Sequence, residues 1–121
     1  MSEIEKLQPS ISPDAGCNIQ FTSGTTGHPK AALISHFSLV NNGTDTGVRI
    51  ELDKYYRRIC LNMPFFHVAG VIAIMNSISH GSTIVMPAPH FKPEEALKSI
   101  VKEKCDSIYA TPSSMLQRTF P

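Results

Sequence analysis

The chain has 121 residues, of which 41% are apolar and 17% charged, and its net charge is +1 at pH 7. This composition is that of a soluble globular domain and excludes collagen, coiled-coil, low-complexity and disordered chains. The near balance of charges argues against a nucleic-acid partner, and the most apolar stretch, Val68 to Met75, is far shorter than the ~20 residues of a membrane-spanning helix.

Residues 1–16 are expected to be a disordered linker, because prolines, glycine and small polar side chains dominate their second half. No targeting segment is recognisable there, so an intracellular protein is expected. The three cysteines are odd in number and widely spaced, and the five histidines are dispersed, so neither a disulfide framework nor a metal site is indicated. The folded part is expected to cover residues 17–121.

A β-hairpin is predicted at the start of the folded part. Residues 18–21 alternate as a short strand does, and Ala31 to Ile34 can return as a second strand. Between them Thr22 to Lys30 contains two glycines, a proline and four hydroxyl side chains, which is the composition of a loop.

A helix should follow the hairpin, with Ser35 as its N-cap. Its apolar stripe runs from Phe37 to Val48 and is weak, because Gly43 and Gly47 interrupt it. A helix is nevertheless predicted here.

The second half of the chain alternates strands and helices. Short β-rich runs at residues 59–63, 82–86 and 106–110 are predicted strands, and residues 68–79 a buried helix with Gly81 as C-cap. A second helix starts at Pro93, with glutamates in its first turn and lysines 98, 102 and 104 toward its other end; a third begins at Pro112. This order predicts an α/β fold with a mostly parallel sheet flanked by helices, and the last helix is expected to be cut short, so that the domain is truncated.

The loop from Thr22 to Lys30 carries the clearest chemical signal. Gly24 and Gly27 allow backbone conformations closed to other residues and a close approach to a ligand, and the loop's hydroxyls and amides are hydrogen-bond donors suited to phosphate oxygens. Lys30 adds a positive charge; one lysine–phosphate pair at ~4 Å and an effective dielectric near 20 is on the order of 4 kcal/mol before desolvation. A flexible hairpin loop with a solvated lysine is the alternative interpretation.

Two common phosphate motifs do not fit this loop. The P-loop pattern needs four residues between its glycines and then Gly-Lys-Ser/Thr, whereas two residues separate Gly24 from Gly27 here, and His28 and Pro29 precede Lys30. The dinucleotide fingerprint also fails, because the residues after the loop predict a strand and not a helix.

The segment Phe21-Thr-Ser-Gly-Thr-Thr-Gly-His-Pro-Lys30 resembles the signature loop of the adenylate-forming (AMP-binding) superfamily, with Ala31 where that family usually has glycine. Residues 35–42, 63–70 and 109–112 resemble further segments of the same family in the same order. Within it, the chain is most similar to the medium-chain acyl-CoA synthetase branch. The resemblance implies part of the large N-terminal domain of an acyl-CoA synthetase.

The resemblance also implies roles for particular residues. Lys30 and His67 are the expected catalytic residues, and His67 with Thr111 borders the acyl-substrate pocket. Without the resemblance, His67 would be interpreted as a histidine that caps a helix or satisfies a buried carbonyl. The expected ATP and phosphate ligands are Thr22, Ser23, Gly24, Thr25, Thr26, Gly27, His28, Pro29 and Lys30.

The implied activity is the ATP-dependent conversion of a fatty acid to acyl-adenylate and then to acyl-CoA. ATP, Mg²⁺ and coenzyme A are the implied cofactors and co-substrates, with most magnesium ligands expected outside this chain. The chain alone is expected to be inactive, because the family's adenine, ribose and hinge segments are not found in it. The alternatives are a truncated product that binds only a partner or nucleotide, and a superfamily member acting on another acid. Self-association through uncovered apolar faces is expected, and a mitochondrial location is compatible with the resemblance.

Overall fold

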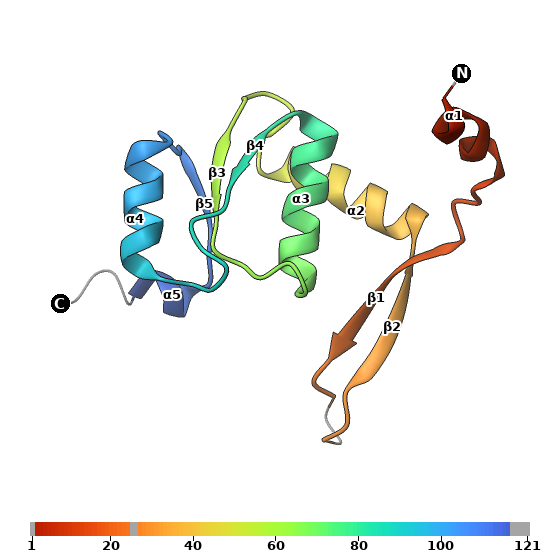
Figure 1. The fold of residues 1–121 in the computed structure, drawn as a ribbon, viewed down its shortest axis with the longest axis horizontal. Coiled ribbons are helices and arrows are strands. Elements are labelled where there is room, and N and C mark those ends of the chain that lie inside the picture. Colours follow the sequence, from red (N-terminus) through yellow and green to blue (C-terminus); the bar gives the residue numbers. More distant parts are fainter. Residues whose placement is uncertain (1, 25–26, 117–121) are drawn as a thin grey trace. The chain divides into compact units, whose positions relative to one another are not determined.

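The computed structural model describes residues 2–24 and 27–116 of the chain. These residues form two compact units, Met1–Asn41 and Asn42–Pro121, and each is described by itself. Figure 1 labels the elements of each unit along the ribbon.

The first unit starts with two short helical segments. Helix α1 (Glu3–Leu7) begins with a capping box, in which the Ser2 side chain accepts from the Glu5 backbone and the Glu5 carboxylate accepts from the Ser2 backbone. A 3₁₀ turn, η1 (Gln8–Ser10), follows directly. None of the side chains of these two segments is buried. The linker at residues 1–16 and the domain boundary at residue 17 stay predictions.

The rest of the first unit is the predicted hairpin. Strand β1 (Gly16–Thr22) pairs antiparallel with β2 (Lys30–Ser35), so that Ile19 lies opposite Leu33 and Thr22 opposite Lys30. The Ser35 hydroxyl accepts a hydrogen bond from the Ser38 backbone, which confirms it as the N-cap of the next helix.

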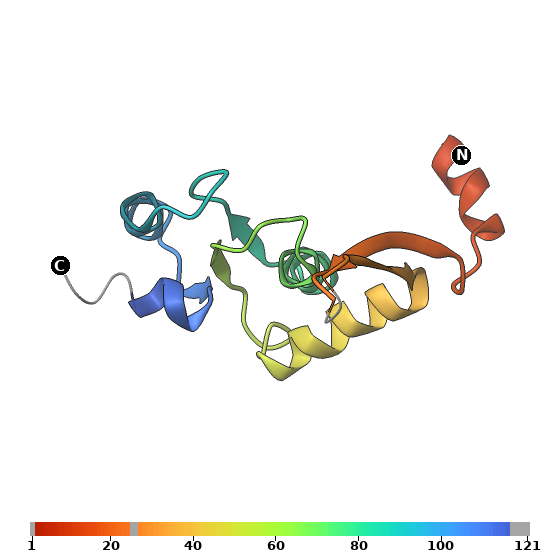
Figure 2. The same cartoon turned by 90° about the horizontal axis from the view of Figure 1, so that it is seen from below.

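Helix α2 (His36–Arg49) continues without a break through both of its glycines. The predicted helix is therefore confirmed, although its apolar stripe is weak. Both are buried within the second unit, where they lie against helix α3 (Val68–His80); Figures 1 and 2 both show the two helices side by side. A Cβ atom on Gly43 would lie 2.6 Å from the Met75 Cβ, so the absence of a side chain permits this close approach.

Polar contacts also join α2 to α3. The His80 Nε2 donates to the Thr44 carbonyl at 3.0 Å. Asn76 is fully buried, and its side-chain amide is oriented so that the nitrogen faces two backbone carbonyls. The amide nitrogen donates to the Ile72 carbonyl at 2.9 Å and to the Gly43 carbonyl at 2.6 Å. These bonds satisfy polar groups that the glycine contact removes from water.

The second unit is built on a three-stranded sheet in the order β4-β3-β5. Both pairings are parallel, which confirms the predicted parallel sheet. Its core includes Ile59, Cys60 and Leu61 of the central strand. Helix α3 contacts β4 and helix α4 contacts β3, so helices flank the sheet. The remaining elements are β3 (Arg58–Leu61), β4 (Thr83–Val85), α4 (Pro93–Lys102), β5 (Ser107–Tyr109) and α5 (Pro112–Leu116).

The helix ends follow their sequence signals closely, with one difference. Gly81 adopts a left-handed conformation (φ 74°) and caps α3, as predicted. Helix α4, however, ends at Lys102, so Lys104 lies beyond it in a left-handed conformation (φ 53°). The Cys105 N–H donates to the Ile100 carbonyl at 2.9 Å, which completes a Schellman motif with Lys104 at the position that usually holds glycine.

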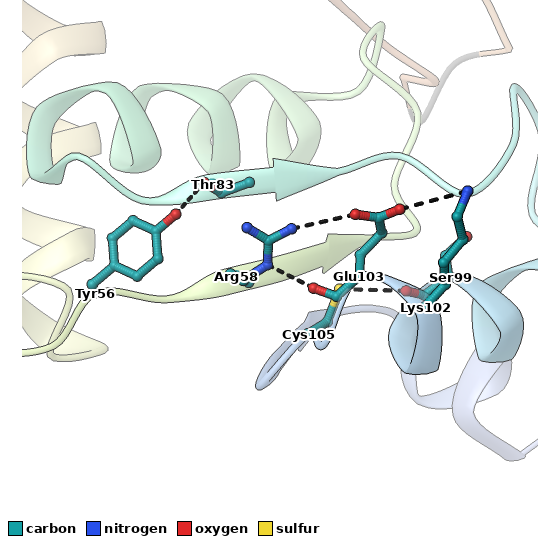
Figure 3. A network of polar contacts seen from close by, with 7 residues as sticks. All are labelled: Tyr56, Arg58, Thr83, Ser99, Lys102, Glu103 and Cys105. Carbon is teal, nitrogen blue, oxygen red and sulfur yellow. Dashed lines mark hydrogen bonds and ion pairs between the residues drawn. The ribbon is translucent and has the colours of Figure 1, made fainter.

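A polar network ties this turn to the start of β3 (Figure 3). The Arg58 Nε donates to the Glu103 carbonyl at 2.6 Å, and its guanidinium pairs with the Glu103 carboxylate at 3.4 Å. Beside it, burial raises the pKa of the Cys105 thiol; the Arg58 charge opposes this rise, and Glu103 and Asp106 add to it. The network lies at the amino ends of the strands, opposite the edge of the sheet formed by their carboxyl ends.

Candidate functional site

The loop of the first unit is held at its base by the hairpin. Thr22 and Lys30 face each other as the last paired residues of β1 and β2, and the Thr22 hydroxyl donates to the Lys30 carbonyl at 3.4 Å. Lys30 is exposed, so its ammonium group is open to a ligand from solvent. Thr25 and Thr26 lie outside the described residues.

Both loop glycines have the backbone conformation that their position in the sequence predicts. Gly24 and Gly27 have φ angles of 61° and 82°, which L-residues with side chains rarely adopt. At Gly24 a Cβ would also strike the His28 carbonyl oxygen, so the loop folds back on itself at this point. Such turns direct successive backbone N–H groups to one side and form concave anion sites. Because residues 25 and 26 between the two glycines lie outside the described residues, the phosphate role of the loop stays a prediction.

His67 directly precedes α3 in the second unit and is exposed. Its Nδ1 accepts a hydrogen bond from the Ala69 N–H at 3.1 Å, so the side chain is the N-cap of the helix. The structure therefore supports the helix-capping interpretation for Nδ1. The other ring nitrogen, Nε2, makes no hydrogen bond with the described residues. The substrate role of His67 stays a prediction.

Thr111 is also an N-cap, at the start of α5. Its Oγ1 accepts from the Ser114 N–H at 3.3 Å and lies 3.0 Å from the Ser113 hydroxyl. The side chain is thereby fixed by its own helix, although Thr111 itself is exposed.

His67 and Thr111 follow the carboxyl ends of neighbouring parallel strands. Residue His67 comes after β3 and Thr111 after β5, and the Asn62 N–H donates to the Tyr109 carbonyl at 2.9 Å where the two strands end. In open α/β sheets, ligands bind outside this edge. The topology therefore places both predicted substrate residues at the edge where a ligand is expected.

Two cavities of about 250 and 370 Å³ open at the same edge, between the segments that follow β3 and β4. Leu61, Met63, Pro64 and residues 87–89 line both, whereas His67 and Thr111 line neither. Sequence reasoning did not predict these lining residues. The proline-containing segments that follow the two strands were the available indication of a cavity here.

Asn62 is a second residue that sequence reasoning missed. It lines the smaller cavity, and its Nδ2 is buried with no hydrogen-bond partner among the described residues. A buried amide donor without a partner is costly, so it marks a position where a ligand oxygen would be stabilised. A polar residue directly after an apolar strand was the available signal.

Residues 2–24 and 27–116 contain no group of three or more His, Cys, Asp or Glu side chains arranged to hold a metal ion. Across the same residues, every helix is too short or too polar to cross a bilayer.

The chain is similar to curated acyl-CoA ligases. The chain is 38% identical over 114 residues to an acyl-CoA ligase, SID4, of Ajellomyces capsulatus, a match that covers 93% of this chain and 19% of the relative. It is 39% identical to the mitochondrial medium-chain acyl-CoA ligase ACSF2 of Danio rerio, with 92% and 19% covered. The chain thus spans about a fifth of the length of these relatives.

Solved structures share the fold. The N-terminal domain of FACL13 from Mycobacterium tuberculosis matches with a TM-score of 0.70 and 29% identity over 91% of this chain and 28% of that one. The o-succinylbenzoate coenzyme A synthetase of Bacillus subtilis, in complex with ATP and magnesium, matches with a TM-score of 0.71 and 26% identity over 88% and 22%. The described α/β fold is therefore that of part of an N-terminal domain of this kind.

The model of the AMP-binding enzyme family matches residues 2–118, nearly the whole chain. This match includes the glycine loop, the segment around His67 and the strand end at Thr111. The chain belongs to the AMP-binding enzyme family.

Proposed function

We propose that this chain is the phosphate-binding and substrate-edge portion of an ATP-dependent acid–thiol ligase that converts a fatty acid to acyl-adenylate and then to acyl-CoA. The observation that carries the proposal is the hairpin loop, with two left-handed glycines and an exposed lysine at its base. Family membership and the acyl-CoA ligases among the relatives support it.

The two half-reactions place different demands on the protein. A substrate carboxylate oxygen attacks the α-phosphorus of ATP and pyrophosphate leaves; the thiol of coenzyme A then attacks the acyl carbon and AMP leaves. In the first step negative charge accumulates on the leaving pyrophosphate. Backbone N–H groups at Ser23, Gly24 and Gly27, together with the Lys30 ammonium, would stabilise that charge without needing to reorganise.

The described residues fit phosphate but provide no magnesium cage of their own. The loop offers hydroxyl and amide groups and a cation but no carboxylate, and magnesium in nucleotide sites is commonly bound through phosphate oxygens and few protein ligands. Bound magnesium would neutralise phosphate charge and polarise the α-phosphate. In this chain, the loop would contribute to that site chiefly by holding the β- and γ-phosphates in place.

We further propose a medium-chain fatty acid as the substrate class. The Danio rerio relative is named as a medium-chain ligase, whereas the Bacillus subtilis structure is of an o-succinylbenzoate synthetase, so family membership alone leaves the acid open. The larger cavity beside β3 and β4 is lined by apolar residues, including Leu61, Met63 and Met86, and this lining favours an aliphatic chain over a dicarboxylate.

The phosphate role can be tested on the chain itself by ¹H–¹⁵N NMR titration with magnesium pyrophosphate, MgATP and AMP. Pyrophosphate and MgATP should shift loop amides from Ser23 to Lys30, whereas AMP, which lacks the β- and γ-phosphates, should not. Lys30→Ala should weaken pyrophosphate binding at least tenfold, which corresponds to about 1.4 kcal/mol.

Lys6→Ala is the matched control, because Lys6 is an exposed lysine of the same unit outside the loop. It should bind pyrophosphate as the unaltered chain does. Equal weakening in both variants, or loop shifts of the same size with AMP, would contradict the proposal.

A further inference from the structure

The two cavities at the carboxyl edge of the sheet adjoin each other but differ in their polar lining. They share six lining residues, all of them apolar. The side chains that line the larger cavity, of about 370 Å³, are apolar throughout. The smaller cavity, of about 250 Å³, is lined in addition by Asn62, His90 and Lys92. The pair therefore has one apolar compartment and one compartment with a polar side.

The side-chain amide of Asn62 has one end free. Its Oδ1 accepts a weak hydrogen bond from the Cys60 thiol, with 3.8 Å between Sγ and Oδ1. Its Nδ2 is buried and has no partner among the described residues. Leaving a buried donor unpaired costs more than a typical hydrogen bond contributes. A ligand oxygen at this wall of the smaller cavity would remove that cost.

Lys92 and His90 add polar groups on the segment that follows β4. In the part of the chain that the structure describes, neither side chain takes part in an ion pair or a hydrogen bond. No Asp or Glu side chain lines the cavity, so its lining carries the positive charge of the lysine and no negative charge. Glu94 and Glu95 follow in the first turn of α4 and would oppose a second negative charge on a ligand. These charges suit an oxyanion with a single negative charge.

We infer that the smaller cavity binds the carboxylate of an aliphatic acid, and that the chain of this acid lies in the adjoining larger cavity. The Asn62 amide and the Lys92 ammonium bind the carboxylate, and the apolar walls remove the chain from water. Neither His67 nor Thr111 lines either cavity, so these two residues do not hold this carboxylate. The identification of the acid as the ligase substrate rests on the proposed function, whereas the binding site does not.

NMR titration of the unaltered chain with octanoate locates the carboxylate. The side-chain NH₂ resonances of Asn62 should shift, together with the backbone amides of Phe91 and Lys92. Octan-1-ol has the same chain without the charge and should bind roughly fivefold more weakly; added salt should weaken the binding of octanoate only. Octyl phosphate, which carries a second negative charge, should bind no more tightly than octanoate.

Two substitutions test the two polar groups separately. Leucine has nearly the shape of asparagine, so Asn62→Leu should bind octanoate about tenfold more weakly, while its urea unfolding midpoint stays equal or rises because an unpartnered buried donor is removed. Lys92→Gln should weaken octanoate binding about fivefold through loss of the charge. Lys102→Gln is the matched control, because Lys102 is an exposed lysine of α4 outside the cavity lining, and it should bind octanoate as the unaltered chain does.

The inference is overturned if octanoate does not bind, or if it shifts the amides of His67 and Thr111 and leaves the Asn62 side chain unaffected. Tighter binding of octyl phosphate or octan-1-ol than of octanoate, or equal weakening in Lys92→Gln and Lys102→Gln, would also overturn it. Failure of the proposed function would be seen separately, as the absence of pyrophosphate binding at the glycine loop. Octanoate binding at Asn62 without pyrophosphate binding would support the carboxylate site and reject its identification as a ligase substrate site.

Discussion

Replacing Gly47 by alanine probes the contact between α2 and α3 directly. Gly47 is buried, and a Cβ at this position would strike the ring of His80, which is itself held by a hydrogen bond to the Thr44 carbonyl. The ring would have to move, and that hydrogen bond would be strained or lost. Overpacking of this kind costs about 1–3 kcal/mol, against a gain of about 1 kcal/mol from the higher helix propensity of alanine.

The sign of the effect should therefore depend on His80. In the unaltered chain we expect Gly47→Ala to lower the free energy of unfolding by about 1 kcal/mol, the net of the two terms. In a His80→Ala background the ring is gone, so the same substitution should raise the free energy of unfolding by up to about 1 kcal/mol. The coupling energy of the double-mutant cycle is then about 1–3 kcal/mol.

Urea unfolding followed by circular dichroism at the helix band measures the four chains of the cycle. Asp45→Ala is the matched control, because Asp45 is exposed on the same helix between the two buried glycines. It should change stability equally in both backgrounds. An equal effect of Gly47→Ala with and without the His80 ring would refute the close helix contact.

Four further predictions concern the end of α4 and the cysteines. Lys104→Gly should raise the free energy of unfolding by about 0.5–1 kcal/mol in urea titrations, because glycine adopts the left-handed conformation at no steric cost; a destabilised variant would argue against that backbone geometry. Arg58→Met should lower it by about 1 kcal/mol through loss of the hydrogen bonds to the turn after α4, and an unchanged unfolding midpoint would show that these half-exposed groups contribute nothing. Iodoacetamide mapping by mass spectrometry should modify exposed Cys17 first, then Cys105, and fully buried Cys60 only on unfolding. The pKa of the Cys105 thiol is raised in the folded state, so the neutral thiol contributes to the free energy of unfolding in full at neutral pH. This contribution should fall as the pH rises above about 9, where the thiol of the unfolded chain ionises. A Cys105→Ser variant should lose this part of the pH dependence of urea unfolding.

The elements of the fold were predictable where a local signal determines them. The apolar run at residues 59–61 forms the central strand, and Gly81 and Pro93 mark helix ends because their backbone preferences act without tertiary contacts. The order of strands and helices then implied the parallel sheet, which the structure confirms.

The role of the two glycines of α2 could not be predicted, because it depends on a partner helix. Gly43 and Gly47 interrupt the apolar stripe of α2, and the sequence does not show that α3 packs against them. At the N-terminus, the capping box of Ser2 with Glu5 is a local signal that composition alone does not reveal.

The candidate site was predictable at the level of motifs but not of contacts. The left-handed glycines of the loop follow from its sequence, and the structure confirms their conformation. The capping bond of His67 and the unpartnered amide of Asn62 require coordinates, because both depend on side-chain orientation.

The most direct test of the phosphate-binding role is covalent labelling with an acyl-phosphate derivative of ATP, whose acyl group transfers to a lysine amine beside the terminal phosphate. Lys30 should be the principal site of acylation, identified by peptide mass spectrometry, and magnesium pyrophosphate should suppress the labelling. Modification spread over the exposed lysines, or labelling of Lys30 that pyrophosphate does not reduce, would contradict the assignment of this loop to the nucleotide phosphates.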